Sequence, residues 1–144
     1  MIEDAVLTKE GLLKIVNDFY QSYVVFLIDD SSGVLTNQST MVDAAPLEID
    51  ELNQYSRLAV TIDPFSFSLN KVSSVTEKKI WQISGGNITF THVCFAVGAN
   101  LINKDTTGTL ERIVGSSSGT PLTINDNGIY VVDQFQILLE GSFS

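Results

Sequence analysis

The segment ITFTHVCFAVG, residues 88–98, decides the fold expected of this chain. Successive side chains of a β-strand point to opposite faces, so the residues divide into two sets. One face takes Val93, Phe95 and Val97, and the other takes Ile88, Phe90, Cys94 and Ala96. Because both sets are apolar, both faces must be covered. The segment therefore predicts the central strand of a β-rich core.

Shorter strand patterns lie on both sides of this segment. They are rich in β-branched and aromatic residues, and clusters of Gly, Asn, Asp and Ser separate them. The predicted strands are Tyr23–Ile28, 55–62, 65–69, 78–83, 108–114, 121–124 and 128–140, with turns at 29–33, 84–87 and 125–128. Many short strands predict a mainly β fold, an antiparallel β-sandwich or jelly-roll-like domain, with residues 1–144 as a single domain.

Alternation within 55–62 predicts the surroundings of its basic residue. Ser56, Leu58, Val60 and Ile62 share the face expected in the core, and Tyr55, Arg57, Ala59 and Thr61 share the wetter face. We therefore expect Arg57 to form an exposed ion pair, which contributes little to stability, and we expect the same of Arg112.

One amphipathic helix is predicted near the N-terminus, at about residues 8–20. Leu12, Ile15, Val16 and Phe19 form its apolar stripe, which should lie against a sheet. Thr8 can cap the helix start, Glu10 suits the positive end of the helix, and Leu7 can pack on Leu12.

The stretch 34–50 gives a weak signal. A short strand at 34–38 and a helical turn or loop at 47–52 are both open, and Pro46 breaks whatever precedes it. We predict irregular structure for the stretch as a whole.

Charge excludes two classes of partner. The chain has 17 acidic and 8 basic residues, for a formal net charge of -9, and no cluster of basic residues. A nucleic acid or an anionic membrane would repel such a chain. The charged fraction of 17% is low, which indicates either a large buried fraction or a surface covered by other subunits.

His92 and Cys94 are the only histidine and cysteine, two residues apart on one predicted strand face. A nucleophilic cysteine needs a base and a lowered thiol pKa, whereas the apolar neighbours would raise that pKa. Structural zinc prefers four such ligands, and this chain offers two. We favour a core thiol beside a hydrogen-bonded histidine, and an intersubunit site built from His92 of several copies stays open.

Other polar clusters are better explained as turns and loops than as sites. Asp29 with Asp30, and the segment 125–128, carry oxygen donors, but Asn, Asp and Gly are ordinary turn residues. The run 115–120 resembles a phosphate loop but lacks its lysine and following helix. We therefore assign no catalytic, cofactor-binding or metal-binding residue, and expect no cofactor.

The order of these pieces resembles a group of small bacteriophage virion proteins of the capsid-decoration, head-fibre and tail-fibre type. In that group a helix with a Leu-Thr start precedes an apolar strand, a Tyr-x-Arg strand, a Gly-x-Ile-Thr-x-x-His-Val type strand, a Gly-x-Leu segment and a C-terminal strand. Here the pieces are 7–20, Tyr23–Ile28, 55–60, 86–96, 108–110 and 128–139. The resemblance implies a β-sandwich that forms symmetric oligomers and attaches to a capsid or tail.

These observations give three expectations about function. The first is a noncatalytic phage virion protein, made in the host bacterial cytoplasm, which forms a homo-oligomer, with a trimer favoured, and binds other virion proteins. The second is a glycan-binding receptor module that uses Trp81, Tyr130 or Asn127. The third is a Cys-His enzyme. The first predicts no nucleic-acid or membrane partner.

Overall fold

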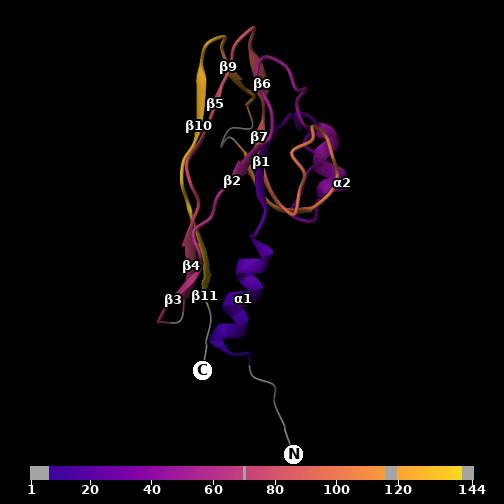
Figure 1. The fold of residues 1–144 in the computed structure, drawn as a ribbon. Coiled ribbons are helices and arrows are strands. Elements are labelled where there is room, and N and C mark those ends of the chain that lie inside the picture. Colours follow the sequence, from indigo (N-terminus) through magenta and orange to yellow (C-terminus); the bar gives the residue numbers. More distant parts are fainter. Residues whose placement is uncertain (1–6, 70, 116–119, 141–144) are drawn as a thin grey trace, which may run out of the picture.

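Antiparallel strands and one N-terminal helix make up the protein, as the sequence predicts (Figure 1). The computed structural model describes residues 7–69, 71–115 and 120–140. The elements are α1 (Lys9–Phe19), β1 (Tyr23–Ile28), α2 (Met41–Ala44), the 3₁₀ helix η1 (Ala45–Leu47), β2 (Leu58–Val60), β3 (Ser66–Ser68), β4 (Lys71–Val75), β5 (Lys79–Gln82), β6 (Ile88–Phe90), β7 (His92–Val97), β8 (Thr109–Gly115), β9 (Leu122–Ile124), β10 (Ile129–Val132) and β11 (Gln136–Glu140). The fold is mainly β and is compatible with a β-sandwich.

The central sheet has the strand order β2-β1-β7-β8. Strands β1 and β7 pair along their whole length, from Tyr23 opposite Val97 to Ile28 opposite His92. Every residue of β1 is buried, because packed side chains cover both faces of the sheet. The prediction that the segment around Cys94 is central is therefore confirmed.

The prediction of one continuous strand over 88–98 is wrong at Thr91. This residue separates β6 from β7: its N–H donates to Ile28 O at 2.8 Å, and its hydroxyl accepts a hydrogen bond from Asp30 N at 2.7 Å. The interruption changes the alternation of faces. Ile88 and Phe90 join the apolar cluster that contains Val93, Phe95 and Val97, not the one that contains Cys94.

A second layer of strands covers one face of the central sheet. The pair β5–β10 packs on the central sheet, and the sheet β11-β4-β3 continues this layer along one side of the molecule and packs against α1 (Figure 1). Thr76 and Phe135 join them, since Thr76 N donates to Phe135 O and Phe135 N donates to Thr76 Oγ1, both at 3.0 Å. The predicted strand 128–140 is thus interrupted between β10 and β11, and β4 is a strand that the sequence did not predict.

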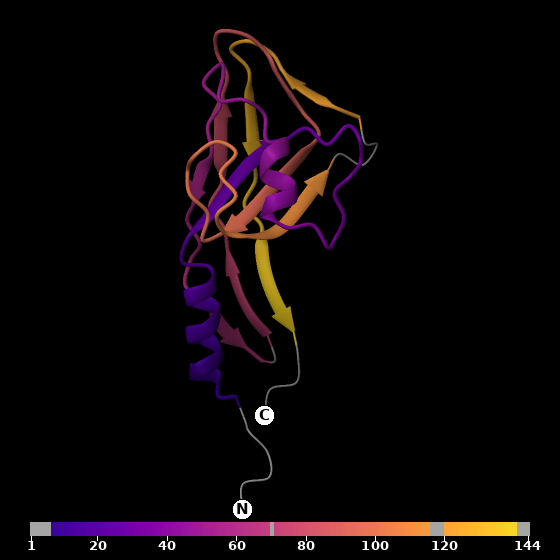
Figure 2. The ribbon, with the colours of Figure 1, turned by 90° about the vertical axis from the view of Figure 1, so that its right-hand side faces the viewer.

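The other face of the central sheet is covered by α2, η1 and the loop after β7 (Figure 2). Buried residues here include Phe26, Met41, Ala45 and Cys94. Irregular structure is therefore the wrong prediction for 41–47. The short helix begins where Thr40 N donates to Asp43 Oδ2 at 2.8 Å, a local capping contact between residues three apart. No strand forms at 34–38.

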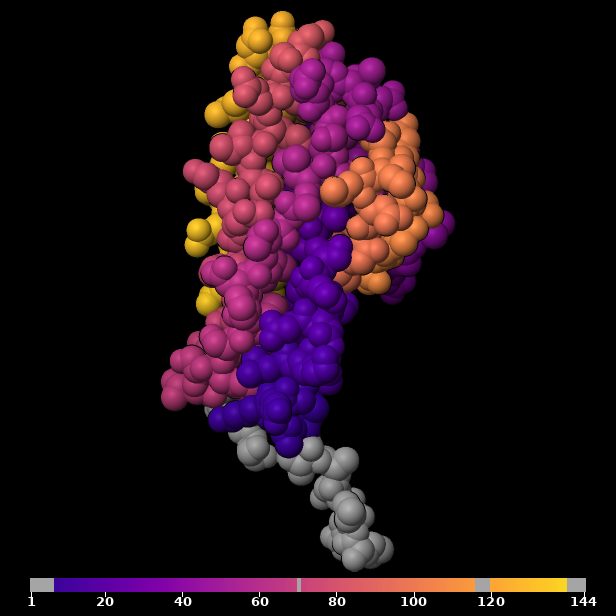
Figure 3. All heavy atoms as spheres, viewed as in Figure 1, coloured from indigo at the N-terminus to yellow at the C-terminus, as the bar shows by residue number. Residues whose placement is uncertain are grey.

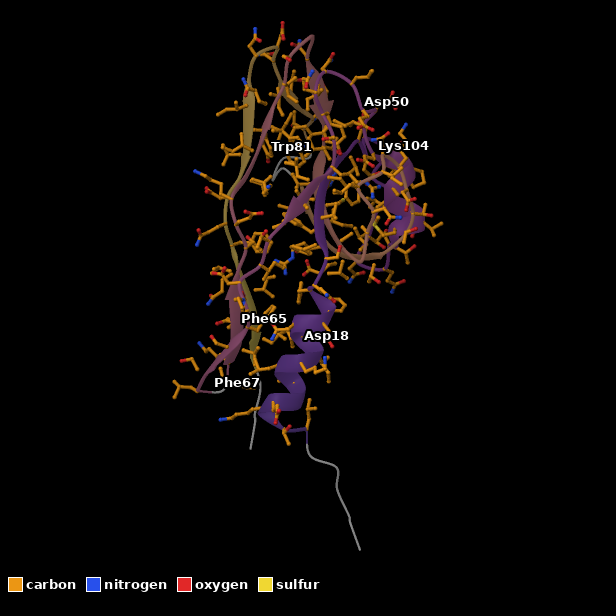
Figure 4. The ribbon with its side chains drawn as sticks, viewed as in Figure 1. Asp18, Asp50, Phe65, Phe67, Trp81 and Lys104 are labelled. Carbon is orange, nitrogen blue, oxygen red and sulfur yellow. The ribbon has the colours of Figure 1, made fainter. Side chains whose placement is uncertain are left out.

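Helix α1 begins and ends within one residue of its prediction. The Thr8 hydroxyl accepts a hydrogen bond from Gly11 N at 3.0 Å, which confirms the cap. Val16 of α1 packs with Phe65, Val72 and Ile137 in a third apolar cluster. Figure 4 shows Phe65 beside the helix.

The predicted apolar stripe of α1 is only partly confirmed. Ile15 and Phe19 are exposed, and Leu13 and Tyr20 pack inward with Leu12 and Val16 instead. The helix carries apolar residues on two adjacent stripes. The stripe with Leu13 and Val16 contacts the sheet β11-β4-β3, and the stripe with Ile15 and Phe19 does not. In the part of the chain that the structure describes, no helix has the length and hydropathy needed to cross a membrane.

Candidate interaction site

Cys94 and His92 have surroundings that favour the core interpretation. Cys94 is fully buried, and burial, followed by the charges of Glu48 and Asp30, raises the pKa of its thiol to about 12. An activated thiolate needs the opposite shift. The His92 ring is half-buried, with Nδ1 2.7 Å from the Thr91 hydroxyl, so the ring has a hydrogen-bond partner next to it in the chain.

Arg57 is buried, so the prediction of an exposed ion pair is wrong. Its Nη2 lies 2.9 Å from Glu48 Oε1, and neither side chain has exposed surface. The guanidinium also donates to the carbonyls of Asn100 and Asp105, each at 2.9 Å, and lies over the Phe26 ring. The loop after β7 closes over this position and supplies the carbonyls, which the alternation of 55–62 could not reveal.

Glu48 is the centre of this buried network. Its Oε2 accepts a hydrogen bond from Tyr55 OH at 2.6 Å, and its Oε1 accepts one from Lys104 N at 2.7 Å. Tyr55 OH also accepts from Leu27 N at 3.0 Å. Burial and the Glu48 charge raise the pKa of Tyr55 far above its ordinary value. Lys104 Nζ closes the loop at the surface by pairing with Asp50 at 2.6 Å (Figure 4). The network fastens the loop to the sheet.

The two candidate cation clusters are turns. Asp30 Oδ1 and Oδ2 accept hydrogen bonds from Val34 N and Leu35 N at 2.9 and 3.0 Å. In the segment 125–128, Gly128 N donates to Asn125 O at 2.8 Å, as expected of a tight turn. Among residues 7–69, 71–115 and 120–140, no group of three or more His, Cys, Asp or Glu could hold a metal ion. Most of the phosphate-like run, 116–119, lies outside the described residues.

The three residues named for glycan binding do not form an exposed set. Trp81 is buried, and its Nε1 donates to Ser56 O at 2.6 Å (Figure 4). Tyr130 is half-buried, with its ring 5.0 Å from Phe90 and 6.4 Å from Trp81 between centroids. Only Asn127 is exposed, in its turn. Trp81 therefore serves the core and offers no free face to a sugar.

A β-bulge in β8 builds a polar cluster that the sequence did not predict. Phe95 lies opposite Arg112 while Ala96 lies opposite Leu110, so Glu111 is the extra residue. A bulge redirects side chains, and here adjacent Glu111 and Arg112 come together, with Arg112 Nε 2.8 Å from Glu111 Oε1. The expectation that Arg112 pairs with an acid is confirmed, but the expectation that the pair is exposed is wrong, because the Glu111 side chain is only 11% exposed.

The Glu111 carboxylate also accepts hydrogen bonds from two tyrosines. Tyr20 OH donates to Oε1 at 3.3 Å, and Tyr23 OH donates to Oε2. Burial and this carboxylate raise the pKa of both tyrosines. Because Tyr20 follows α1 and Tyr23 begins β1, the cluster connects the helix to the central sheet.

A groove that includes Arg112 lies beside this cluster, between the two layers of strands. Its volume is about 420 Å³, and its walls come from β7 and β8 on one side and from β10 and the segment after it on the other. The lining is mostly apolar, including Val93, Phe95, Val114 and Val131. Arg112 lies in the groove, with its guanidinium 4.6 Å from the centre of the Phe135 ring.

Two of the strands that line the groove, β8 and β10, are sheet edges. Within the described residues, β8 pairs only with β7, and β10 pairs only with β5. Ile83 N donates to Gly128 O at 2.9 Å, and hydrogen-bonded pairs alternate along an antiparallel ladder. The N–H and C=O of Ile129 and Val131 therefore point away from β5. This free edge of β10 can bind a further strand.

In the comparisons with known proteins, no family model, no curated protein and no solved structure matches the chain. The candidate site therefore stands on two observations, the groove and the free edge of β10. Hydrophobicity alone could not have located them, because an edge strand and a paired strand can carry the same pattern.

Proposed function

We propose that this chain is a noncatalytic structural protein of a bacteriophage virion. It assembles as a homo-oligomer, with a trimer favoured, and attaches to the capsid or tail. Its place is the virion, and it is made in the host bacterial cytoplasm. The resemblance of its sequence pieces to small virion proteins supports this proposal, and so does the mainly β fold with its N-terminal helix.

The free edge of β10 beside the apolar groove carries the proposal. An unpaired strand edge is a template for another chain, and proteins that do not use such an edge usually block it with charges, proline or a covering segment. Ile129 and Val131 are exposed and uncharged at this edge. The occupant we propose is an extended strand of a capsid or tail protein, bound by main-chain hydrogen bonds and by side chains that enter the groove.

The contacts of the buried ionisable groups also support a noncatalytic binding role, because a catalytic acid, base or nucleophile would have to be available to a substrate. Glu48 and Arg57 neutralise each other in the core, Glu111 is shared by Arg112 and two tyrosines, and the pKa of the Cys94 thiol is raised. The charged groups are held in contacts within the fold, and the thiol is held neutral by burial. The acidic exterior keeps the subunit soluble before assembly and away from packaged DNA.

Two measurements test the proposal. Mass photometry of the purified chain should show trimers or a larger closed assembly, and peptide mass spectrometry of purified phage particles should detect the chain in a fixed ratio to the capsid or tail proteins. A chain that stays monomeric and is absent from the particles would overturn the proposal. A sugar array is the discriminating control, because specific binding of a defined glycan would favour a receptor module instead.

A further inference from the structure

The two layers of strands are joined along one side of the molecule and open along the other. On the side of β2, Glu77 N donates to Thr61 O at 3.0 Å, and Asp63 N donates to Val75 O at 3.1 Å. Figure 3 shows this joined side, where the magenta and pink atoms of β2 to β5 form one continuous surface. On the open side, no main-chain hydrogen bond joins β8 to β10 in the part of the chain that the structure describes. The outer edge of β8 is therefore accessible to a further strand.

This edge of β8 has main-chain groups that lack a partner strand. In the ladder between β1 and β7, Gly98 N donates to Ser22 O at 2.9 Å, and hydrogen-bonded pairs alternate along an antiparallel ladder. The alternation directs the main-chain groups of Phe95 toward β8, where its partner is Arg112. The N–H and C=O of the next residue, Ile113, therefore point away from β7.

A hollow lies on each face of β8 beside this edge. On one face is the apolar groove described above, next to Arg112 and Val114. On the other face, a hollow of about 450 Å³ lies between Ile113 and the loop 35–39. Figure 2 shows this loop, in purple, beside the orange β8. We call the second hollow the polar hollow, because its lining includes Thr36, Asn37, Ser39 and His92.

The polar hollow places hydrogen-bonding groups close to β8. His92 lies opposite Gly115 in the ladder, and a Cβ at Gly115 would come within 2.7 Å of the ring Nε2. Glycine at this position therefore leaves room for the imidazole beside the strand. Because Nδ1 lies 2.7 Å from the Thr91 hydroxyl, Nε2 is the ring nitrogen that a ligand can use.

A strand added to β8 would direct its side chains alternately into the two hollows. Directly opposite residues of paired strands have their side chains on the same face, so the residue opposite Ile113 faces the polar hollow. Its two neighbours lie opposite Arg112 and Val114 and face the apolar groove. The matching occupant is therefore an extended segment in which one short polar residue stands between two apolar residues.

We propose that β8 binds such a segment of the capsid or tail protein to which this chain attaches. The inference rests on the proposed function, which supplies the partner, and it adds a second strand edge and a sequence preference. Main-chain hydrogen bonds to Ile113 provide affinity, and the alternate side chains provide specificity. The bulge at Glu111 ends the regular edge, so the contact spans residues 112–115.

The test is a titration of the 15N-labelled full chain with synthetic peptides, followed by amide NMR spectra. The peptide Gln-Gln-Val-Thr-Val-Gln-Gln should bind and should shift the amide signals of Ile113 and Gly115 most. Gln-Gln-Thr-Val-Thr-Gln-Gln, in which polar and apolar residues are exchanged, should bind about fivefold more weakly or worse. A proline in place of the central threonine removes the N–H that Ile113 O accepts and should abolish binding.

Two variants of the chain provide a matched comparison at exposed valines. Val114→Asp places a charge in the apolar groove and should weaken binding of the first peptide about tenfold or more. Val42→Asp, on α2, is the control and should change binding less than about twofold. Because Val114 is 51% exposed and Val42 is 68% exposed, both variants should fold.

The outcomes separate this inference from the proposed function. If no peptide binds at millimolar concentration, or if the shifts are confined to Ile129 and Val131, the inference about β8 fails and the virion role stands. If Val114→Asp dissociates the oligomer seen by mass photometry, a second copy of the chain occupies β8, and the inference is also overturned. Absence of the chain from purified phage particles contradicts the proposed function, whatever the peptides show.

Discussion

Glu48 and Arg57 form an ion pair that has no exposed surface, with 2.9 Å between Glu48 Oε1 and Arg57 Nη2. The two residues come from separate segments of the chain, one directly after η1 and one directly before β2. Their contact fixes the loop after β7 through the carbonyls of Asn100 and Asp105.

Removal of one partner of this pair should destabilise the protein strongly. Glu48→Ala leaves the Arg57 charge buried without its counter-ion, which costs about 3–5 kcal/mol. Urea unfolding followed by tryptophan fluorescence measures the loss. The double variant Glu48→Ala with Arg57→Met should lose less than the sum of the two single variants. Strict additivity would show that the pair is not coupled.

Stability should fall in alkali, in part through Cys94. The thiol is neutral in both folded and unfolded chains below its ordinary pKa of about 8.5. Above that pH the unfolded chain ionises, while the folded thiol stays neutral up to its raised pKa of about 12. The free energy of unfolding therefore decreases by up to about 1.4 kcal/mol per pH unit from this group within that window.

Cys94→Ala isolates the contribution of the thiol. The variant should be less stable than the wild type at pH 7, because it leaves a small cavity, and the difference should shrink between pH 8 and pH 10. That window precedes most ionisation of Tyr23 and Tyr55, whose raised pKa values act in the same direction at higher pH. A difference that does not change with pH would contradict the raised thiol pKa. Urea unfolding with a reductant present provides the measurement.

Proline substitution should distinguish the free edge of β10 from its paired edge. The Val131 N–H points away from β5, so Val131→Pro removes the donor for an added strand and leaves the ladder to β5 intact. The Val132 N–H points toward β5, so Val132→Pro removes a ladder hydrogen bond and should destabilise the protein by about 1–3 kcal/mol. Thermal unfolding compares the two variants, and incorporation into phage particles tests binding. Normal incorporation of Val131→Pro would exclude the edge as the docking site.

Trp81 should behave as a core residue. Trp81→Ala removes a buried ring and should cost about 3–5 kcal/mol. Trp81→Phe keeps most of the packing but loses the hydrogen bond to Ser56 O, at a cost of about 1–3 kcal/mol. Chemical denaturation measures both. A Trp81→Ala variant of wild-type stability would mean that the ring is not packed as described.

The predictable features of this protein are those that depend on local pattern. The buried β1, the tight turn at 125–128 and the Thr8 cap all follow from residue type and spacing over a few positions. The features that the pattern did not give depend on contacts between distant segments. Thr91 interrupts a continuous apolar run because its N–H bonds to Ile28 at the end of β1. The buried pair of Glu48 and Arg57 depends on the loop after β7, which covers the pair and supplies two carbonyls to Arg57.

The sequence by itself therefore determined the fold class, the N-terminal helix, the central position of the segment around Cys94 and the burial of its thiol. It could do so because apolar periodicity reports which face of an element must leave water. Only the tertiary structure decided which stripe of α1 is covered, which strands are sheet edges, and that Arg57 is buried. These properties depend on which segments pack against one another in the folded chain. A strand or helix has the same local pattern whether or not another segment packs beside it.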